Sequence, residues 1–493
     1  MIYKNNLYMK NILTIILLFI LPTTSYSKDV IIDGVAYNLN DNNQKATVIS
    51  KEVPYKGDVV IPGKIAYGGI EYSVTGIGEY AFGGCSELSS ISIPESVDTI
   101  YRDAFMDCSN ITSVIIPNNV VEIGIGAFAN CVNLTSVELS SRINKLSNGL
   151  FDGCYKLSNI VIPSNIISIE PHAFRRCYSL TSLYLPKGLK TLKADCFSEC
   201  NNLSEINISE TVDSIFYSAF SYCANIEKII VEEGNIKFDS RNNCNAIIET
   251  SSNRLILGCK TSVLPMELET IGEGAFIGRE IDSIILPDNI KKIEGHAFYN
   301  CEMLSSIKLP SALQTIEYAA FMGCKKLVGI NLPEAISSIR NSVFEGCSNL
   351  TSIIIPSSLD EIQGETFKNC TSLESVYIGN KVRKIGNSAF ENCSDLANVY
   401  CYATEPPSCN KDAFLNSYYT SATLYVPENS LDLYKNARVW KNFNSIVSLE
   451  TGINSIDNTN NSLYYYSLDG KRFLSQPLKK GIYINGRQKL IIK

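Results

Sequence analysis

The sequence is poor in the residues and segments on which several classes of function depend. Of its 493 residues only two are histidines and one is a tryptophan. It has no block of basic residues, and its formal net charge is −7. Nucleic-acid-binding proteins need a basic surface, so no nucleic-acid partner is expected. Beyond the N-terminal region, no apolar run approaches the roughly 20 residues of a membrane-spanning helix.

The two histidines, His172 and His296, both lie directly before an Ala-Phe pair. Tyr, Asp, Ser and Glu fill the same position in other copies of this motif, so the position is expected to be variable and solvated. A spacing of about 4.8 Å per coil would separate the two imidazoles by roughly 20 Å, too far for a shared metal or proton. No catalytic residue, metal site or cofactor is therefore predicted. The enzymatic alternative is a single histidine acting with a serine or cysteine nucleophile.

The N-terminus has the layout of a secretory signal. Lys4 and Lys10 precede an apolar run over residues 12–21, and the small residues of Ser25-Tyr26-Ser27 follow it. We expect a signal peptide over residues 1–27 and a secreted mature chain.

What the sequence has in abundance is a repeat. A phenylalanine recurs in steps of 22 or 23 residues, with one interruption of 56 residues and one degenerate last copy. The series is Phe82, Phe105, Phe128, Phe151, Phe174, Phe197, Phe220, Phe276, Phe298, Phe321, Phe344, Phe367, Phe390 and Phe414. The composite copy reads I-x-x-x-A-F-x-x-C-x-x-L, and a short alternating run such as Val137-Glu138-Leu139 follows, which suits a strand with one buried face.

One such coil cannot bury its apolar side, but stacked coils share a continuous core. The period favours a leucine-rich repeat solenoid, a right-handed coil stack of short strands with turns and short helical segments. A small β module is expected at the C-terminus. The expected division is a signal peptide 1–27, an N-terminal cap 28–75, repeats 76–397, a C-terminal cap 398–449, and a linker with the β module 450–493.

An insertion interrupts the repeats at about residues 232–265. It contains two strand-like runs, 246–249 and 254–257, separated by a turn-rich tetrad. This pattern predicts a hairpin that protrudes from the stack.

These motifs resemble a known family. The phase I-x-x-x-A-F-x-x-C-x-x-L, the insertion NCNAIIETSSNRLILGC and the segment LYVPENSLDLYKNARVWKNF are similar to BspA-like leucine-rich repeat surface proteins of the Bacteroidetes type. The resemblance covers roughly residues 30–449, and residues 464–493 are similar to C-terminal sorting segments of exported Bacteroidetes proteins. It implies a cell-surface adhesin of host or microbial macromolecules, without catalytic residues or cofactors.

The cysteines divide into a repeated column and a few others. Twelve share the repeat position: Cys85, Cys108, Cys131, Cys154, Cys177, Cys200, Cys223, Cys301, Cys324, Cys347, Cys370 and Cys393. Side chains in register point the same way and not toward each other, so we predict buried thiols that pack as small hydrophobes. Outside the column, Cys244 with Cys259 and Cys401 with Cys409 are the local pairs where disulfides are considered.

The outward side of the predicted strands is the candidate binding surface. One outward column is small and polar, and the column beside it carries apolar residues at many copies: Ile115, Val161, Tyr184, Ile230, Ile285, Ile354, Tyr377 and Tyr400. Exposed apolar patches often mark interaction sites, although such residues are also good strand formers. Its two strongest patches are Val161 with Tyr184, and Ile354 with Tyr377 and Tyr400.

The predicted function is therefore a non-enzymatic, secreted protein displayed at the outer cell surface. Its partners would be host or microbial surface proteins or glycans, bound by the strand face or the insertion. The alternative is a glycan-capturing or scaffolding component of an envelope complex, favoured if the tyrosines stack on sugars.

Overall fold

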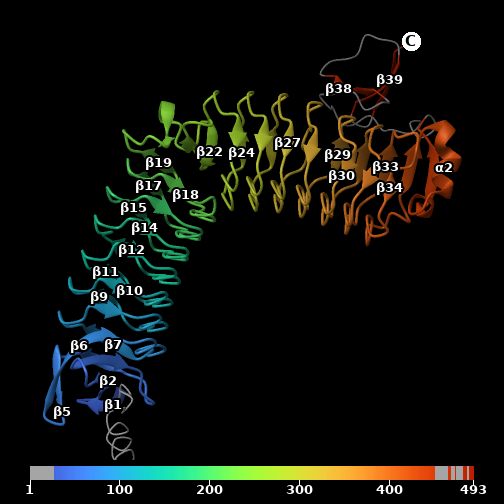
Figure 1. Cartoon of the computed structure of the whole chain (residues 1–493). Helices are drawn as coiled ribbons and strands as arrows, with labels where there is room; N and C mark the ends of the chain where they lie inside the picture. The colour runs from blue at the N-terminus through green and yellow to red at the C-terminus, as the bar shows by residue number, and fades with distance from the viewer. Residues whose placement is uncertain (1–26, 450–464, 468–471, 474–480, 486–487, 493) are drawn as a thin grey trace, which may run out of the picture. The chain divides into compact units, whose positions relative to one another are not determined.

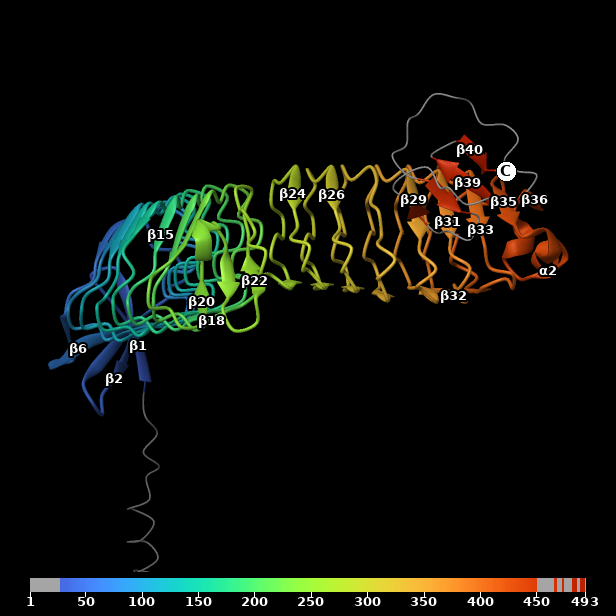
Figure 2. The ribbon, with the colours of Figure 1, turned by 90° about the horizontal axis from the view of Figure 1, so that it is seen from above.

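The structure, a computed structural model, consists of stacked coils with short strands and few helices (Figure 1 and Figure 2). It describes residues 27–449, 465–467, 472–473, 481–485 and 488–492. The predicted signal sequence before Ser27 and the predicted linker over residues 450–464 lie outside the described residues. The chain divides into two compact units, Met1–Asn165 and Ile166–Lys493. The expected solenoid is confirmed in both.

Antiparallel strands cover the N-terminal end of the first unit. They are β1 (Ser27–Ile32), β2 (Val35–Asn40), β3 (Lys45–Ile49), β5 (Lys64–Tyr67) and β6 (Ile70–Ile77). β1, β2 and β3 pair in order, β3 lies parallel to β6, and β5 folds back on β6. The ring of Tyr55 packs 4.5 Å from that of Phe82, so this segment also covers the first aromatic ring of the repeat core.

Most coils contribute two short strands that join parallel neighbours. In the first unit these are β4 (Gly57–Val60), β7 (Leu88–Ser92), β8 (Thr99–Ile100), β9 (Ser113–Ile115), β10 (Glu122–Ile123), β11 (Ser136–Glu138), β12 (Lys145–Leu146) and β13 (Asn159–Ile160). Ser136 lies opposite Ser113 and Glu138 opposite Ile115, which is a register of one repeat. In β9 the middle residue is buried and its neighbours are exposed, so the predicted one-sided burial is confirmed.

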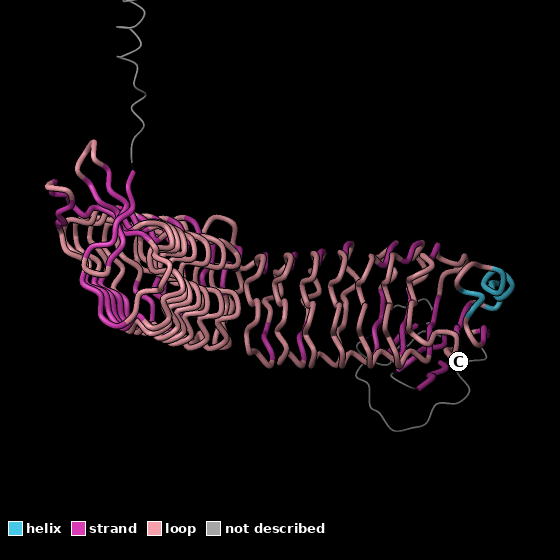
Figure 3. The backbone as a smooth tube through the Cα atoms, turned by 90° about the horizontal axis from the view of Figure 1, so that it is seen from below, coloured by secondary structure: helices cyan, strands magenta, loops and turns pink. Residues whose placement is uncertain are grey.

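The second unit repeats this arrangement over more coils. The strands that follow the motif leucine form the strand face: β15 (Ser182–Tyr184), β17 (Glu205–Ile208), β19 (Lys228–Val231), β24 (Ser283–Ile285), β26 (Ser306–Lys308), β29 (Ser352–Ile355), β31 (Ser375–Ile378), β33 (Asn398–Cys401), β35 (Thr423–Val426) and β36 (Ser445–Ser448). Turns and loops make up most of each coil between the short strands (Figure 3).

The strands before the Ala-Phe turn form the opposite sheets of the second unit. They are β14 (Ser168–Ile169), β16 (Thr191–Leu192), β18 (Ser214–Ile215), β23 (Thr270–Ile271), β25 (Lys292–Ile293), β27 (Thr315–Ile316), β28 (Ser338–Ile339), β30 (Glu361–Ile362), β32 (Lys384–Ile385) and β34 (Ser408–Cys409).

The repeated phenylalanines fill the core as a stack of rings. Within each unit, ring centroids of successive coils are 5.0 to 5.9 Å apart and the planes are within 20° of parallel. The degenerate copy also joins, because Phe414 stacks on Phe390 at 5.1 Å. The repeated phenylalanine thus stacks on its equivalent in the next coil, and a single coil could not bury this side chain by itself.

The cysteine column forms the predicted ladder of thiols, and all twelve members are buried. Its thiols also make a specific contact. Each of ten thiols donates to the carbonyl oxygen of the phenylalanine one coil earlier, as Cys131 does to Phe105 at 3.2 Å and Cys301 to Phe276 at 3.0 Å. Cysteine suits this position because it is small, apolar and a hydrogen-bond donor.

The insertion contains the predicted hairpin, but the expectation that it protrudes is wrong. Its elements are β20 (Phe238–Asp239), the 3-10 helix η1 (Arg241–Asn243), β21 (Ile247–Glu249) and β22 (Arg254–Leu257). β21 and β22 pair antiparallel, and β22 then pairs in parallel with β23 of the next coil. Ile248 and Leu255 belong to the hydrophobic core. Because these apolar strand residues need burial, the hairpin becomes part of the stack.

Arg279 takes the place of cysteine in the coil that follows the insertion. Its guanidinium is buried, with a residue exposure of 2%. It donates to the carbonyl oxygens of Phe220 and Cys223, each at 2.8 Å, and of Gly258 at 3.3 Å. Burial lowers the pKa of this guanidinium. One side chain thus joins the coil before the insertion, the insertion itself and the coil after it.

A helical turn covers the C-terminal end of the core. It consists of η2 (Glu428–Ser430), α2 (Leu431–Asn436) and η3 (Trp440–Asn442). The indole Nε1 of Trp440 donates to Pro407 O at 2.8 Å, and the phenol of Tyr434 donates to Ala403 O at 2.8 Å. Beyond it, β37 (Tyr465–Ser467), β38 (Arg472–Phe473), β39 (Gly481–Asn485) and β40 (Gln488–Ile492) form an antiparallel sheet, the small β module expected from the sequence.

Candidate ligand-binding surface

The apolar column of the strand face is in register within each sheet. Tyr184 lies opposite Asn207, which lies opposite Ile230. Further along, Ile285 lies opposite Lys308, and Ile354 opposite Tyr377. The column therefore exists as separate segments and not as one unbroken stripe.

Exposure differs strongly along this column. Ile115, Val161, Tyr184 and Ile285 are exposed, with Ile285 at 89%, whereas Ile230, Ile354, Tyr377 and Tyr400 are half-buried. Val161 and Tyr184 belong to different units of the chain. Their predicted joint patch therefore remains a prediction.

A tyrosine ladder is the most ordered part of the surface, and we define it as Tyr377, Tyr400 and Tyr425. The three residues lie opposite one another on β31, β33 and β35. Ring centroids are 4.6 Å and 4.4 Å apart, with interplanar angles of 4° and 8°. Both faces of Tyr400 are therefore covered by neighbouring rings, and the ladder offers ring edges and hydroxyl groups to a ligand.

The third member of the ladder, Tyr425, is not among the binding residues predicted from the sequence. Tyr425 lies in the run Leu424-Tyr425-Val426-Pro427, which ends in proline as the repeat strands do. Without the repeat's Ala-Phe and cysteine at the usual distance, this strand was assigned to the cap. The proline ending of the run was the signal that could have placed Tyr425 in the column.

The central hydroxyl of the ladder, that of Tyr400, is held neutral. Burial, followed by the neighbouring Tyr377 and Tyr425 phenols, raises the pKa of Tyr400. The hydroxyl of Tyr425 donates to Asn398 Oδ1 at 3.4 Å. At neutral pH Tyr400 thus carries an uncharged phenol, which suits a polar group at the edge of an apolar contact.

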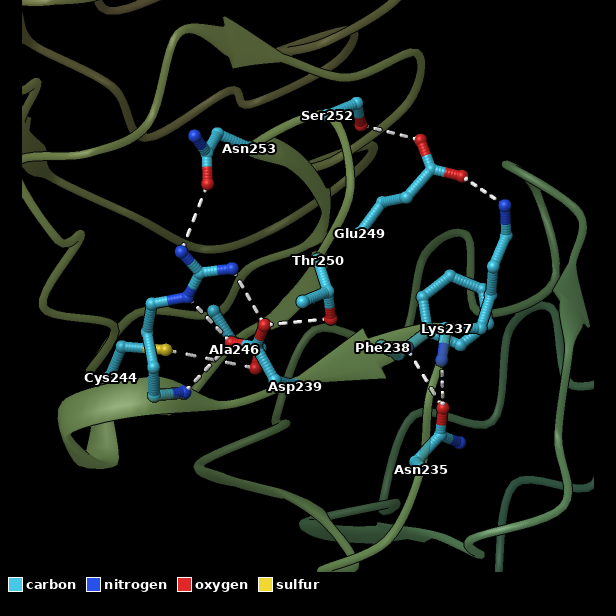
Figure 4. A network of polar contacts seen from close by, with 11 residues as sticks. Asn235, Lys237, Phe238, Asp239, Cys244, Ala246, Glu249, Thr250, Ser252 and Asn253 are labelled. Atoms are coloured by element: carbon cyan, nitrogen blue, oxygen red, sulfur yellow. Dashed lines mark hydrogen bonds and ion pairs between the residues drawn. The ribbon is translucent and has the colours of Figure 1, made fainter.

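A cleft of about 870 Å³ opens between β19 and the insertion. Its lining includes Lys228, Ile230, Glu232, Asp239, Arg241 and Asn245. Figure 4 shows the polar network that fixes one wall, centred on Asp239, which accepts hydrogen bonds from Arg241 at 2.6 and 2.8 Å and from Thr250 at 2.8 Å. Burial opposes ionisation of Asp239, but these bonds outweigh it and lower the pKa of its carboxyl. The Arg241 charge is thereby neutralised within the wall.

The cysteines outside the ladder are also free thiols in the structure. The sulfur of Cys401 is 3.1 Å from the Tyr434 hydroxyl, and that of Cys259 is 3.3 Å from the Thr261 hydroxyl. The pairings of Cys244 with Cys259 and of Cys401 with Cys409 therefore stay predictions for a thiol measurement.

The histidines occupy a position with left-handed backbone. His172 and His296 have φ of 59° and 55°, and Asp195 and Glu365 share this geometry in other coils. The position is not uniformly solvated as expected, since each histidine has a buried Nδ1 without a hydrogen-bond partner. Burial lowers the pKa of His296. Over the described part of the chain, no group of three or more His, Cys, Asp or Glu side chains is arranged to hold a metal ion.

Comparison with known proteins identifies the repeat. The family model of the BspA type leucine rich repeat region matches in six copies, over residues 64–179, 144–252 and 269–397. This chain belongs to the BspA-type leucine-rich repeat family. No curated protein matches the BspA-type chain.

Two solved structures are similar to this BspA-type chain. A leucine rich cell surface protein from Faecalibacterium prausnitzii A2-165 is 28% identical with a TM-score of 0.52, over 76% of this chain and 94% of that one. A leucine-rich repeat protein from Eubacterium ventriosum ATCC 27560 is 18% identical with a TM-score of 0.52, over 79% and 95% of the two chains. The second likeness supports the fold alone.

Membership has two functional consequences. The BspA-type family and the leucine-rich repeat fold are typically non-catalytic, and the repeats suggest a role in binding other proteins. BspA-like proteins are cell-surface or secreted. Within the described ranges, no helix of this chain has the length and apolarity to cross a membrane.

Proposed function

We propose that this chain is a non-enzymatic binding protein, secreted and displayed at the outer cell surface, that engages host or microbial surface proteins through its strand face. The observation that carries the proposal is the tyrosine ladder. Its members extend over three consecutive strands, and rigid aromatic side chains bury much area at little cost in conformational entropy. Tyrosines held in a stack are already ordered before a partner arrives, which favours affinity.

The ladder geometry favours a protein partner over a glycan. Sugar rings stack on open aromatic faces, whereas Tyr400 has a ring at 4.6 Å on one side and at 4.4 Å on the other. Its edges and hydroxyls remain for contact with side chains and main-chain groups of a protein. Glycan capture, the alternative expected from the sequence, therefore has less support.

Two findings support display at the cell surface. The N-terminal residues have the composition of a secretory signal. The similar Faecalibacterium prausnitzii protein is described as a cell surface protein.

Binding of the mature chain to host matrix proteins, beside a glycan array, tests the proposal. Tyr377→Ser with Tyr400→Ser should weaken protein binding by about thirtyfold, because losing a central aromatic contact costs roughly 2 kcal/mol. Tyr184→Ser is the matched control, since Tyr184 is an exposed strand-face tyrosine opposite Asn207 and outside the ladder. Unchanged binding by the double variant would refute the ladder as the site. Binding to glycans alone would favour the glycan-capturing alternative.

A further inference from the structure

The strand face is interrupted where the insertion enters. The sheet of β15, β17 and β19 ends at β19, and the next strands form a separate sheet of β24 and β26. The repeat phase assigns the intervening strand to residues 261–265, because Pro265 precedes Thr270 by five residues as Pro310 precedes Thr315. In the structure these residues do not form a strand. The Val263 N–H instead donates a hydrogen bond to Cys244 O at 2.9 Å.

The two sides of this interruption differ in their backbone hydrogen bonds. On the β19 side, Asn245 Oδ1 accepts from the Ile229 N–H at 2.6 Å, and Ser240 Oγ accepts from the Val231 N–H at 3.1 Å. Side chains of the insertion thus satisfy this edge, and no further strand is needed there.

The β24 edge has no such cover. In most other coils the residue before the strand donates to the preceding coil, as the Ser305 N–H does to Asp282 O at 3.0 Å and the Glu227 N–H to Ser204 O at 2.9 Å. Among the described residues, the corresponding N–H of Asp282 has no acceptor, which it shares with Thr112 and Thr181, but only Asp282 adjoins the insertion. β24 is therefore an open edge of a parallel sheet, which is a template for another strand.

Apolar side chains beside this edge are also uncovered. Ile284 occupies the core column, where its counterparts Ile307 and Ile353 are 7% and 1% exposed, yet Ile284 is only partly buried. Ile285 is 89% exposed and Val263 75%. Two hollows, of about 320 and 400 Å³, are both lined by Leu264, Ile284 and Ile285. We call the space between residues 261–265 and β24 the strand gap.

We infer that the strand gap binds an extended peptide segment of a partner protein, which adds to the β24 edge as a parallel strand. The segment would supply an acceptor for the Asp282 N–H and an inward apolar side chain over Ile284. Its outward residue would lie between Val263 and Ile285, so the segment must be apolar on both faces. Lys260 lines the same hollow and interacts with Glu280. The exposed carboxylate of Asp282, directly before β24, remains to favour a lysine or arginine just before the apolar run.

This site is separate from the tyrosine ladder and does not rest on it. The ladder lies on β31, β33 and β35, whereas the strand gap adjoins β24. A partner could use either surface alone.

The probe is a synthetic capped peptide with the sequence Lys-Val-Thr-Val-Ile-Val, added to the full chain. Hydrogen exchange of the β24 amides and fluorescence anisotropy of the labelled peptide are measured. The peptide should slow exchange at Asp282 and Ile284 by about tenfold or more at a concentration of about 1 mM. A version with Glu in place of Lys should bind more weakly.

Variants of β24 separate main-chain pairing from charge. Asp282→Pro removes the N–H and should lower peptide affinity by about tenfold or more, whereas Asp282→Asn keeps the N–H and should lower it less. Ile285→Lys, at a highly exposed position, should also weaken binding in a chain that stays folded. Tyr400→Ser should leave peptide binding unchanged, which distinguishes this site from the ladder.

Three outcomes would overturn the inference. One is unchanged β24 exchange at the highest peptide concentration. The second is equal peptide affinity for Asp282→Pro and the wild type. The third is protection of β24 that rises with protein concentration without peptide, because a second copy of the chain would then occupy the strand gap.

Discussion

At the scale of single residues, Arg279 is the main departure from the repeat. Ten cysteines of its column each donate to the carbonyl oxygen of a phenylalanine, and buried Ser417 does the same in the last coil, whereas Arg279 makes three hydrogen bonds across the insertion. Position 258 requires glycine, since a Cβ there would lie 2.3 Å from Cε1 and Cζ of Phe276. The insertion is thus accommodated by one residue that is larger than the consensus and one that has no side chain.

Replacing Arg279 by methionine should destabilise the chain by about 3 kcal/mol, because three buried carbonyl groups lose their donor. Urea unfolding followed by circular dichroism measures the change. Arg279→Cys should be intermediate, since a thiol can still donate to Phe220 O. Arg340→Met is the control: its exposed side chain lies 3.6 Å from Glu317, and its loss should cost less than about 0.5 kcal/mol. Equal stability of Arg279→Met and the wild type would contradict the bridging role.

At the scale of elements, the cysteine ladder ties stability to pH. Burial raises the pKa of Cys301 and Cys347 from the ordinary 9.0 to about 12. Below pH 9 these thiols are protonated in the folded and the unfolded chain alike. Above pH 9 the unfolded chain releases protons that the folded chain retains, so stability falls as pH rises toward 12.

We therefore expect the unfolding free energy to decrease steadily between pH 9 and 12, the window set by Cys301 and Cys347. Cys301→Ala with Cys347→Ala should be less stable at neutral pH but have a shallower decrease over this range. Lysines and tyrosines also titrate there, so the difference between the two slopes is the measured quantity. Identical slopes would show that these thiols do not control the effect.

At the scale of the whole molecule, the redox state of the cysteines distinguishes two ways of stabilising a chain that is proposed to be secreted. Secreted proteins commonly rely on disulfides, but in this chain one hydrophobic cluster extends from Cys244 to Phe443 and sixteen of the seventeen cysteines are buried. Buried neutral thiols react slowly, because the thiolate is the reactive form.

A thiol count on the denatured, unreduced protein should therefore give all 17 free thiols. Denaturation before labelling is needed because the folded chain shields them. A count lower by four would indicate that the pairs Cys244 with Cys259 and Cys401 with Cys409 form after export. A count near zero would contradict the ladder itself.

Much of the fold could be predicted because the copies of the repeat can be aligned with one another within the same chain. The positions of Phe128, Cys131 and Leu134 recur in coil after coil, and a residue type that recurs at a fixed step must face its own copies. The predicted strand over residues 254–257 coincides with β22, because a short apolar run between turns favours a strand even outside the repeat. What failed was the prediction that the hairpin protrudes.

The sequence by itself determined the coil, the composition of each core column and the outward column of the strand face, because these follow from neighbours at a constant step. Only the tertiary structure decided how the exceptions are accommodated. Arg279 reaches Phe220 across 59 residues, Tyr425 completes the ladder from a degenerate copy of the motif, and β24 keeps an open edge. Each depends on contacts that no period encodes, since the residues involved occur once.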